Sequence, residues 1–135
     1  APPASAQALR ARYRALESRR SPDGRQLWLN WTVRLKDGGV AIGYVQATVL
    51  PDAGALVAYE FNSAWWGRGL ASEAVAAAMQ ELRDRLGVAR FGAVFKTANV
   101  RSRRLLTRLG MGLAADGEFP SALVEAGESA MAIAF

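Results

Sequence analysis

One short stretch, Trp65–Ala74, combines glycines with a helix start in a way that suits anion binding. Its glycines, Gly67 and Gly69, are separated by one residue, so the backbone can turn tightly and bring its N–H groups close to a ligand. The helix expected to follow contributes unpaired N–H donors and a partial charge of about +0.5 at its first turn. Ser72 adds a hydroxyl and Arg68 a formal charge. A strand, a glycine turn and a helix N-terminus together form a cradle for a pyrophosphate.

The same residues have a purely structural interpretation. A capped helix with a tight turn ahead of it would also place Gly-x-Gly at a helix start, which is a common arrangement. The stretch does not match a dinucleotide fingerprint, which needs Gly-x-Gly-x-x-Gly inside a parallel βαβ unit. It is not a P-loop either, since no Gly-Lys-Ser/Thr follows. Taken alone, the glycine stretch leaves both interpretations open.

A second stretch of the chain gathers basic side chains. Five of them lie close together with no acidic residue among them: Lys96, Arg101, Arg103, Arg104 and Arg108. Such a cluster can bind a nucleic acid, and it can equally bind a small molecule that carries phosphate. Six further arginines lie within the first 25 residues, and we interpret them as the solvated face of a helix. The net charge of +5 therefore has two separate sources.

The composition excludes several classes of chemistry. The chain has 135 residues, and neither cysteine nor histidine is among them. It therefore has no disulfide, thiolate nucleophile, Ser-His-Asp triad or Cys- or His-bound metal, and we expect no metal at the site. Acid–base chemistry is left to carboxylates, Tyr, Lys, Ser, the backbone or water. The length suits one domain that spans residues 1–135.

No segment of the sequence has the character of a membrane anchor or a secretory signal. No apolar run approaches the roughly 20 residues that cross a bilayer. Residues 1–15 lack the apolar core of a signal peptide. We therefore expect a cytoplasmic protein with no membrane partner.

Apolar periodicity predicts the elements that position these two stretches. A period of two is typical of half-buried strands, and a period near 3.6 is typical of amphipathic helices. Short turns rich in Gly, Pro and Asp join the first three strands into an antiparallel meander. The predicted order is helix 6–20, strands 26–36, 40–50 and 55–61, helix 70–86, strand 90–95, helix 99–109, strand 111–115, loop 117–129 and strand 130–135. This order indicates an α+β domain with a central mixed, mostly antiparallel sheet flanked by helices.

The two stretches together resemble the GNAT (general N-acetyltransferase) superfamily. Residues 66–71, Trp-Gly-Arg-Gly-Leu-Ala, are similar to that family's acetyl-CoA loop, with Trp in place of the usual first Gln or Arg. Asn99-x-x-Ser102, followed by Arg104 and a Leu-Gly-Met at 109–111, resembles its second cofactor motif. The likeness covers about residues 26–115 and is closest to the branch that acetylates ribosomal-protein N-termini. It implies a GNAT-like fold and an acetyl-CoA-dependent enzyme.

The resemblance also implies roles for individual residues. Acetyl-CoA would be the co-substrate, with no metal. Backbone groups of Tyr59 and Phe61 would hold its pantetheine arm, and Asn99 would hydrogen-bond the same arm. Arg104 would lie near the phosphates or the adenine. The loop and the first helical turn would form the rest of the cofactor site, at Trp66, Gly67, Arg68, Gly69, Leu70, Ala71 and Ser72.

The implied reaction is direct attack of a neutral amine on the thioester, which depends mainly on positioning and on a nearby N–H donor. Ser102 lies where this branch protonates the departing thiolate; the alternative is a hydroxyl that bonds back along its own helix. Glu60 is the best-placed carboxylate to accept the amine's proton, because its strand is otherwise apolar. The alternative for Glu60 is to point to solvent from the outer face of the sheet. Strand parity puts Glu60 opposite Tyr59 and Phe61, and it does not say which face meets the acceptor.

The sequence departs from the family pattern at its start. Relatives usually open with an additional strand and helix, whereas only one helix is predicted ahead of residue 26, so we expect the N-terminal strand to be missing. Part of the acceptor site would then be absent, trimmed or supplied by a partner chain, such as the second copy of a homodimer. No Tyr follows Tyr59, so the C-terminal Tyr that many relatives use as general acid is absent. Trp65 and Trp66 are candidates to line an acceptor pocket, and Trp28 and Trp31 to pack in the core.

Three functions fit these residues. The favoured one is an N-acetyltransferase that moves an acetyl group from acetyl-CoA to a primary amine, either a protein N-terminus or a small amine. The second is a catalytically weak CoA-binding or scaffold module that keeps the cradle and lacks a complete acceptor site. A basic nucleic-acid-binding module is the least favoured. Phosphate recognition accounts for the basic stretch, and no RRM, OB or helix-turn-helix signature is present.

Overall fold

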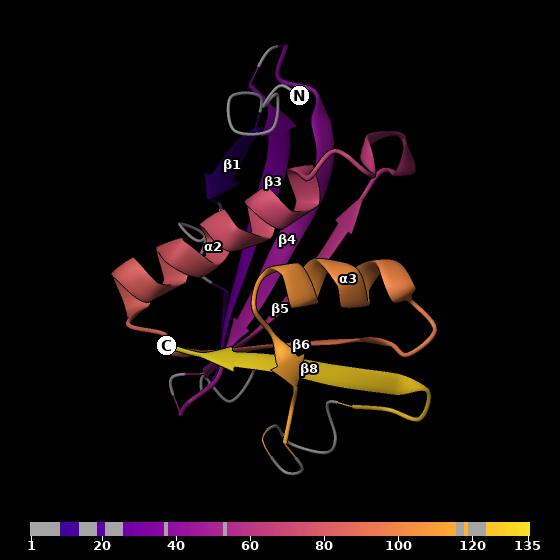
Figure 1. Cartoon of the computed structure of the whole chain (residues 1–135). Coiled ribbons are helices and arrows are strands. Elements are labelled where there is room, and N and C mark those ends of the chain that lie inside the picture. The colour runs from indigo at the N-terminus through magenta and orange to yellow at the C-terminus, as the bar shows by residue number, and fades with distance from the viewer. Residues whose placement is uncertain are drawn as a thin grey trace.

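The structure is a computed structural model of the chain, and it describes residues 9–13, 19–20, 26–36, 38–52, 54–115, 118 and 124–135. For residues 9–13 and 19–20 it describes the backbone. Figure 1 shows one twisted sheet with the helices α2 (Leu70–Leu86) and α3 (Val100–Arg108) in front of it. The two helices contact each other, and they cover neighbouring parts of the sheet.

Within the described ranges, the strands form a single 8-stranded sheet in the order β1-β3-β4-β5-β6-β8-β7, with β2 paired to β3 outside this path. All pairs of neighbours are antiparallel except β5 and β6, which are parallel. This arrangement confirms the predicted α+β class with a mixed, mostly antiparallel sheet. The strands are β1 (Leu9–Tyr13), β2 (Arg19–Arg20), β3 (Leu27–Leu35), β4 (Ala41–Val49), β5 (Gly54–Phe61), β6 (Arg90–Lys96), β7 (Gly112–Leu113) and β8 (Glu128–Ala134).

The meander β3-β4-β5 agrees with the prediction to within one residue at each strand end. The predicted alternation of buried and more exposed side chains is present in β3. Leu29, Trp31 and Val33 are all buried on the face that meets the helices. Trp31 is 2% exposed and belongs to the core, as expected. Trp28 is 39% exposed, so the predicted packing role does not hold for this side chain.

Both helices follow the predicted apolar pattern. Helix α2 begins at Leu70, buries Val75, Met79 and Leu82 among others, and ends at Gly87, whose φ of 66° is the left-handed conformation that glycine adopts without strain. Helix α3 is one residue shorter at each end than predicted, because Asn99 is its N-cap and Leu109 its C-cap. Within the described part of the chain, neither of these helices nor any other has the length and apolar character needed to cross a membrane.

Strands β5 and β6 separate soon after they begin. Their parallel pairing covers three residue pairs, from Gly54↔Arg90 to Leu56↔Gly92, and ends there. β5 continues to Phe61 alongside β4, and β6 continues to Lys96 alongside β8. The sheet therefore opens between β5 and β6, on the side where α2 begins and α3 lies (Figure 1).

The N-terminal prediction is wrong within the described residues. Leu9–Tyr13 forms strand β1 rather than part of a helix, and it pairs antiparallel with β3 from Leu9↔Leu35 to Tyr13↔Trp31. The expectation of a missing N-terminal strand is corrected by the same finding. Without β1, much of β3 would be an open sheet edge with unpaired N–H and C=O groups, and this pairing outweighs helix propensity. The alternation Leu-Arg-Ala-Arg-Tyr at 9–13 is a strand signal that the helix interpretation overlooked.

The remaining predictions for the two ends of the chain are confirmed in part. Arg10, Arg12, Arg19 and Arg20 lie in strands, which contradicts the predicted helix face, while residues 1–8, 14–18 and 21–25 lie outside the described residues. At the other end, β8 begins at Glu128, two residues before the strand predicted for 130–135. Strand β7 covers only Gly112–Leu113 of the predicted 111–115. Residues 117 and 119–123 of the predicted loop lie outside the described residues.

We predict that Gly43→Ala destabilises the sheet. Gly43 faces Phe61 across the β4–β5 pair, and a Cβ there would lie 2.6 Å from Phe61 Cδ2 and against the Glu60 backbone. Overpacking of this kind costs about 1–3 kcal/mol. Urea unfolding measures the loss. Gly112→Ala is the matched control, because a Cβ at Gly112 would meet nothing within 4 Å. Equal stability of the two variants would contradict the packing described for Gly43.

Candidate active site

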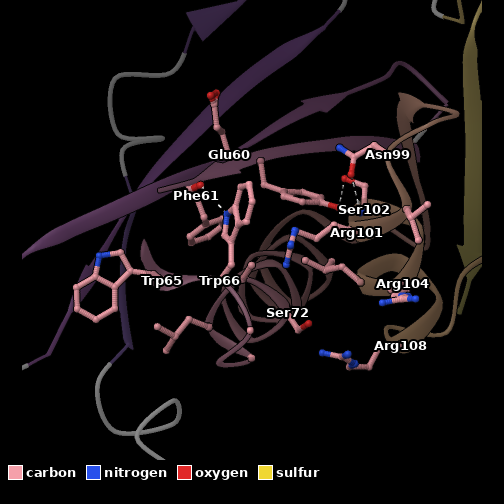
Figure 2. A pocket seen from close by; sticks show the side chains of 17 residues that line it. Glu60, Phe61, Trp65, Trp66, Ser72, Asn99, Arg101, Ser102, Arg104 and Arg108 are labelled. Carbon is pink, nitrogen blue, oxygen red and sulfur yellow. Dashed lines mark hydrogen bonds between the residues drawn. The ribbon is translucent and has the colours of Figure 1, made fainter. Parts of the chain in front are cut away.

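A cavity of about 530 Å³ occupies the opening between β5 and β6. It lies between the end of β5, the N-terminus of α2 and one face of α3, and Figure 2 shows its side chains. All of the predicted site residues except Arg68 line it. The lining residues are Tyr59, Glu60, Phe61, Trp65, Trp66, Gly67, Gly69, Leu70, Ala71, Ser72, Asn99, Val100, Arg101, Ser102, Arg104, Leu105 and Arg108.

The glycine loop delivers an uncapped helix end to this cavity. Gly67 and Gly69 have φ of 80° and 76°, a region in which side-chain-bearing residues are strained, and a Cβ at either would meet nothing within 4 Å. Gly69 is the N-cap of α2 and provides no side-chain cap. The first intrahelical bond runs from the Glu73 N–H to the Gly69 carbonyl at 3.1 Å, so the N–H groups of residues 70–72 precede the helical ladder. Ser72 lines the cavity three residues after the N-cap.

Helix α3 presents a basic face to the same cavity. Arg101, Arg104 and Arg108 all line it, since residues at i, i+3 and i+7 share one side of a helix. The sequence analysis assigned an individual role to Arg104 and named Arg101 and Arg108 only as members of the basic cluster. The helical spacing of the three arginines is the signal that would have found them together.

Two tryptophan–arginine pairs flank the glycine loop. The Arg101 guanidinium lies 4.1 Å over the Trp66 ring, and the Arg68 guanidinium lies 5.0 Å over the Trp65 ring. Cation–π contacts at exposed sites contribute about 0.5–1 kcal/mol. Arg68 is the predicted site residue that does not line the cavity, and this pairing with Trp65 accounts for its orientation.

Alternate residues of β5 turn their backbone toward the opening. The Asn62 N–H donates to the Ile42 carbonyl at 2.9 Å, so the even-numbered residues at this end of β5 bond to β4. In an antiparallel pair the residues between them point their N–H and C=O the other way. The backbone of Tyr59 and Phe61 therefore faces the opening, as the predicted contact with a pantetheine arm requires. The Phe61 carbonyl already accepts a hydrogen bond from Trp66 Nε1 at 2.9 Å, which leaves its N–H for a ligand.

Ser102 is held by two other residues of the site. Its backbone N–H donates to Asn99 Oδ1 at 3.1 Å, which makes Asn99 the side-chain cap of α3. The Tyr59 hydroxyl donates to Ser102 Oγ at 3.0 Å. Burial raises the pKa of Tyr59 above its ordinary value, and the hydrogen bond with Ser102 offsets part of that rise. Tyr59 therefore stays protonated at neutral pH. Sequence reasoning missed its side chain and assigned only its backbone.

Glu60 lies on the opposite face of β5 from Tyr59. Its side chain is exposed, and the Tyr44 hydroxyl donates to Glu60 Oε1 at 3.4 Å. In Figure 2 the Glu60 carboxylate points away from Ser102 and from the arginines. The strand parity that the sequence left undecided thus turns Glu60 toward the outer face of the sheet.

Comparisons with known proteins identify related sequences and folds. A family model described as an acetyltransferase (GNAT) domain matches residues 1–112. None of the curated proteins matches the chain. Among similar solved structures, an acetyltransferase (GNAT family) from Bacillus anthracis has a TM-score of 0.66 at 21% identity over 78% of this chain and 65% of that one. The ribosomal-protein-S5-alanine acetyltransferase from Vibrio fischeri has a TM-score of 0.64 at 19% identity, over 79% and 61%.

A third similar structure is that of a ribosomal L7/L12 alpha-N-protein acetyltransferase in complex with coenzyme A. Its TM-score is 0.67 at 16% identity, over 84% of this chain and 64% of that one. At these identities the likeness is one of fold. The chain spans less than two thirds of the length of each of the three solved chains.

We predict that Asn99→Ala destabilises the protein by about 1 kcal/mol, the usual cost of losing a side-chain N-cap. The reason is that the Ser102 N–H loses its acceptor. Thermal or urea unfolding measures the change. Asn99→Ser is the control, because serine caps helices nearly as well as asparagine. An alanine variant as stable as the serine variant would contradict the capping role.

Proposed function

The chain belongs to the acetyltransferase (GNAT) domain family, and we propose that it transfers an acetyl group directly from acetyl-CoA to a primary amine. The observation that carries this proposal is the cavity in which the uncapped start of α2, the basic face of α3 and Ser102 come together. The acceptor that we propose is a protein N-terminus or a small amine. A cytoplasmic location and a homodimer remain predictions from the sequence.

The cavity suits both the phosphates and the pantetheine arm of acetyl-CoA. The N–H groups of residues 70–72 and the positive end of the α2 dipole favour a pyrophosphate. Arg104 and Arg108, one helical turn apart on α3, supply positive charge for the remaining phosphate. The backbone of Tyr59 and the N–H of Phe61 face the opening and suit the amides of a pantetheine arm. Asn99 uses its Oδ1 to cap α3, so its amide NH₂ is the group that we assign to the same arm.

Acetyl-CoA supplies the acetyl group as a thioester, whose C–S bond breaks as the amine nitrogen bonds to the carbonyl carbon. Of the β5 groups that face the opening, the Tyr59 N–H suits the developing negative charge on the carbonyl oxygen, which leaves the Tyr59 carbonyl and the Phe61 N–H for the pantetheine amides. Ser102 Oγ gives its proton to the departing sulfur, which yields the free thiol, and recovers a proton from solvent. Glu60 would have to act through water, because its carboxylate points away from the cavity. We therefore assign the removal of one proton from the attacking amine to water; among the described residues that line the cavity, Glu60 is the one carboxylate.

One observation favours a second function, a CoA-binding module with weak transfer activity. Of the described residues that line the cavity, Glu60 is the only acid, and its side chain faces the other side of the sheet. A site of this kind binds an anionic ligand well and lacks a general base of its own. The nucleic-acid interpretation is less favoured, because Arg101, Arg104 and Arg108 line the same cavity as the start of α2 and Ser102.

We predict that the wild-type chain binds CoA in calorimetry and that Gly69→Asp weakens binding at least tenfold. An Asp at the α2 N-cap would place a carboxylate where the pyrophosphate is proposed to lie. Gly87→Asp is the matched control, because Gly87 has a similar φ of 66° and equally open space at the other end of α2. The dissociation constant of Gly87→Asp for CoA should stay within twofold of the wild-type value, which is a change in binding free energy below about 0.5 kcal/mol. Equal affinities of the two variants would contradict the proposed pyrophosphate cradle.

We further predict amine-dependent release of CoA thiol when acetyl-CoA is offered with a panel of peptides and small amines. Ser102→Ala should lower kcat by about 10²–10⁴-fold, the range that a general acid contributes. Thr107→Ala, which removes an exposed hydroxyl from the same helix, is the control and should be as active as wild type. Full turnover by Ser102→Ala would reassign the proton to water. CoA binding without thiol release from any amine would favour the binding module.

A further inference from the structure

Tyr59 places a phenol beside the proposed proton donor. Its side chain leaves the helix-facing side of β5, and its hydroxyl reaches across the cavity to Ser102 Oγ at 3.0 Å, a contact between residues 43 positions apart in the chain. The Tyr59 side chain is half-buried. The contact joins the strand that faces the opening to the first turn of α3.

The direction of this hydrogen bond decides where the Ser102 proton goes. A serine hydroxyl has one proton to donate and two lone pairs that accept. Tyr59 donates, so it fills one lone pair of Ser102 Oγ and leaves the serine proton unused. A serine in a first helical turn often donates to a nearby backbone carbonyl. Within the described part of the chain, Ser102 Oγ makes no such bond, and its proton is available to a ligand in the cavity.

The bond also changes how well Ser102 donates. A hydroxyl that accepts a hydrogen bond is polarised and becomes a stronger donor in turn. Because burial raises the pKa of Tyr59, the phenol keeps its proton, and with it this bond, throughout the neutral range.

We propose that Tyr59 is a positioning residue that holds Ser102 Oγ with its proton directed at the sulfur of bound CoA. This inference rests on the proposed function for the place of the sulfur. In the transfer step the amine nitrogen forms the C–N bond, the C–S bond breaks with its electron pair on sulfur, and the Ser102 proton goes to that sulfur. Solvent returns a proton to Ser102 and takes one from the amine, so Tyr59 ends the step unchanged.

Kinetics of four proteins test the proposal: wild type, Tyr59→Phe, Ser102→Ala and the double variant. Tyr59→Phe removes one oxygen and keeps the ring, so we expect kcat to fall about 5- to 50-fold, part of what a general acid contributes. The KM for acetyl-CoA and the calorimetric affinity for CoA should change less than about threefold. The double variant should be no slower than Ser102→Ala alone, because Tyr59 acts through Ser102.

A matched control removes a phenol oxygen outside the cavity, and two kinetic results would contradict the proposal. Tyr44→Phe removes a phenol oxygen from the neighbouring strand on the exposed face, and its kcat should equal that of wild type. The proposal is overturned if Tyr59→Phe keeps kcat within twofold of wild type. It is also overturned if Tyr59→Phe slows the Ser102→Ala background as much as it slows wild type.

A second measurement needs no acceptor amine and no variant that must turn over. Absorbance at 295 nm follows tyrosine ionisation, and the step lost in Tyr59→Phe belongs to Tyr59. Saturating CoA should raise the pKa of that step, because its thiolate would lie beside the Ser102–Tyr59 pair. Desulfo-CoA, which lacks the sulfur, should leave it unchanged. The same shift with both ligands, or no shift with either, overturns the proposal. Absence of turnover by wild type, with the sulfur-dependent shift present, would instead overturn only the proposed function.

Discussion

The separation of β5 from β6 is the constraint on which the rest of the site depends. Three residue pairs hold the two strands together, and beyond Leu56↔Gly92 each continues along a different neighbour. A parallel pair that stayed closed would bond the backbone of Tyr59 and Phe61 to β6. The opening instead turns those groups toward a ligand, and it gives the N-terminus of α2 and one face of α3 a common space to line.

The positive charge at this opening comes from two sources, one fixed in position and one on flexible side chains. The uncapped turn of α2 provides N–H groups whose positions are fixed by Gly67 and Gly69, at φ values that other residues adopt only with strain. The arginines of α3 provide formal charge on long side chains, and Arg101 is partly held by its contact with the Trp66 ring. Fixed dipoles bind an anion without reorganising, whereas the arginines can adjust to it. Together they make the cavity suitable for a phosphate-rich ligand and unsuitable for a cationic one.

Local patterns in the sequence were sufficient for the elements that bury one regular face. The alternation of β3 and the apolar spacing of α2 predict their bounds closely, and the glycine loop and Asn99-x-x-Ser102 predict most of the cavity lining. The prediction failed where pairing outweighs propensity, as at β1, whose residues pair with residues of β3 that lie 18 or more positions further along the chain. It also missed the Tyr59 phenol and the orientation of Glu60. Both depend on which face of β5 meets α3, a long-range relation that strand periodicity leaves undecided.

We propose that coenzyme A lies in the opening between β5 and β6, with its phosphates at the start of α2 and its sulfur near Ser102. Amide chemical shifts recorded by NMR while CoA is added test this claim residue by residue. We expect the largest changes at the amides of residues 67–72, at Phe61 and in the first turn of α3, with β3 nearly unaffected. Saturable shifts that centre on the exposed face of β3 and β4, or elsewhere away from this opening, would contradict it.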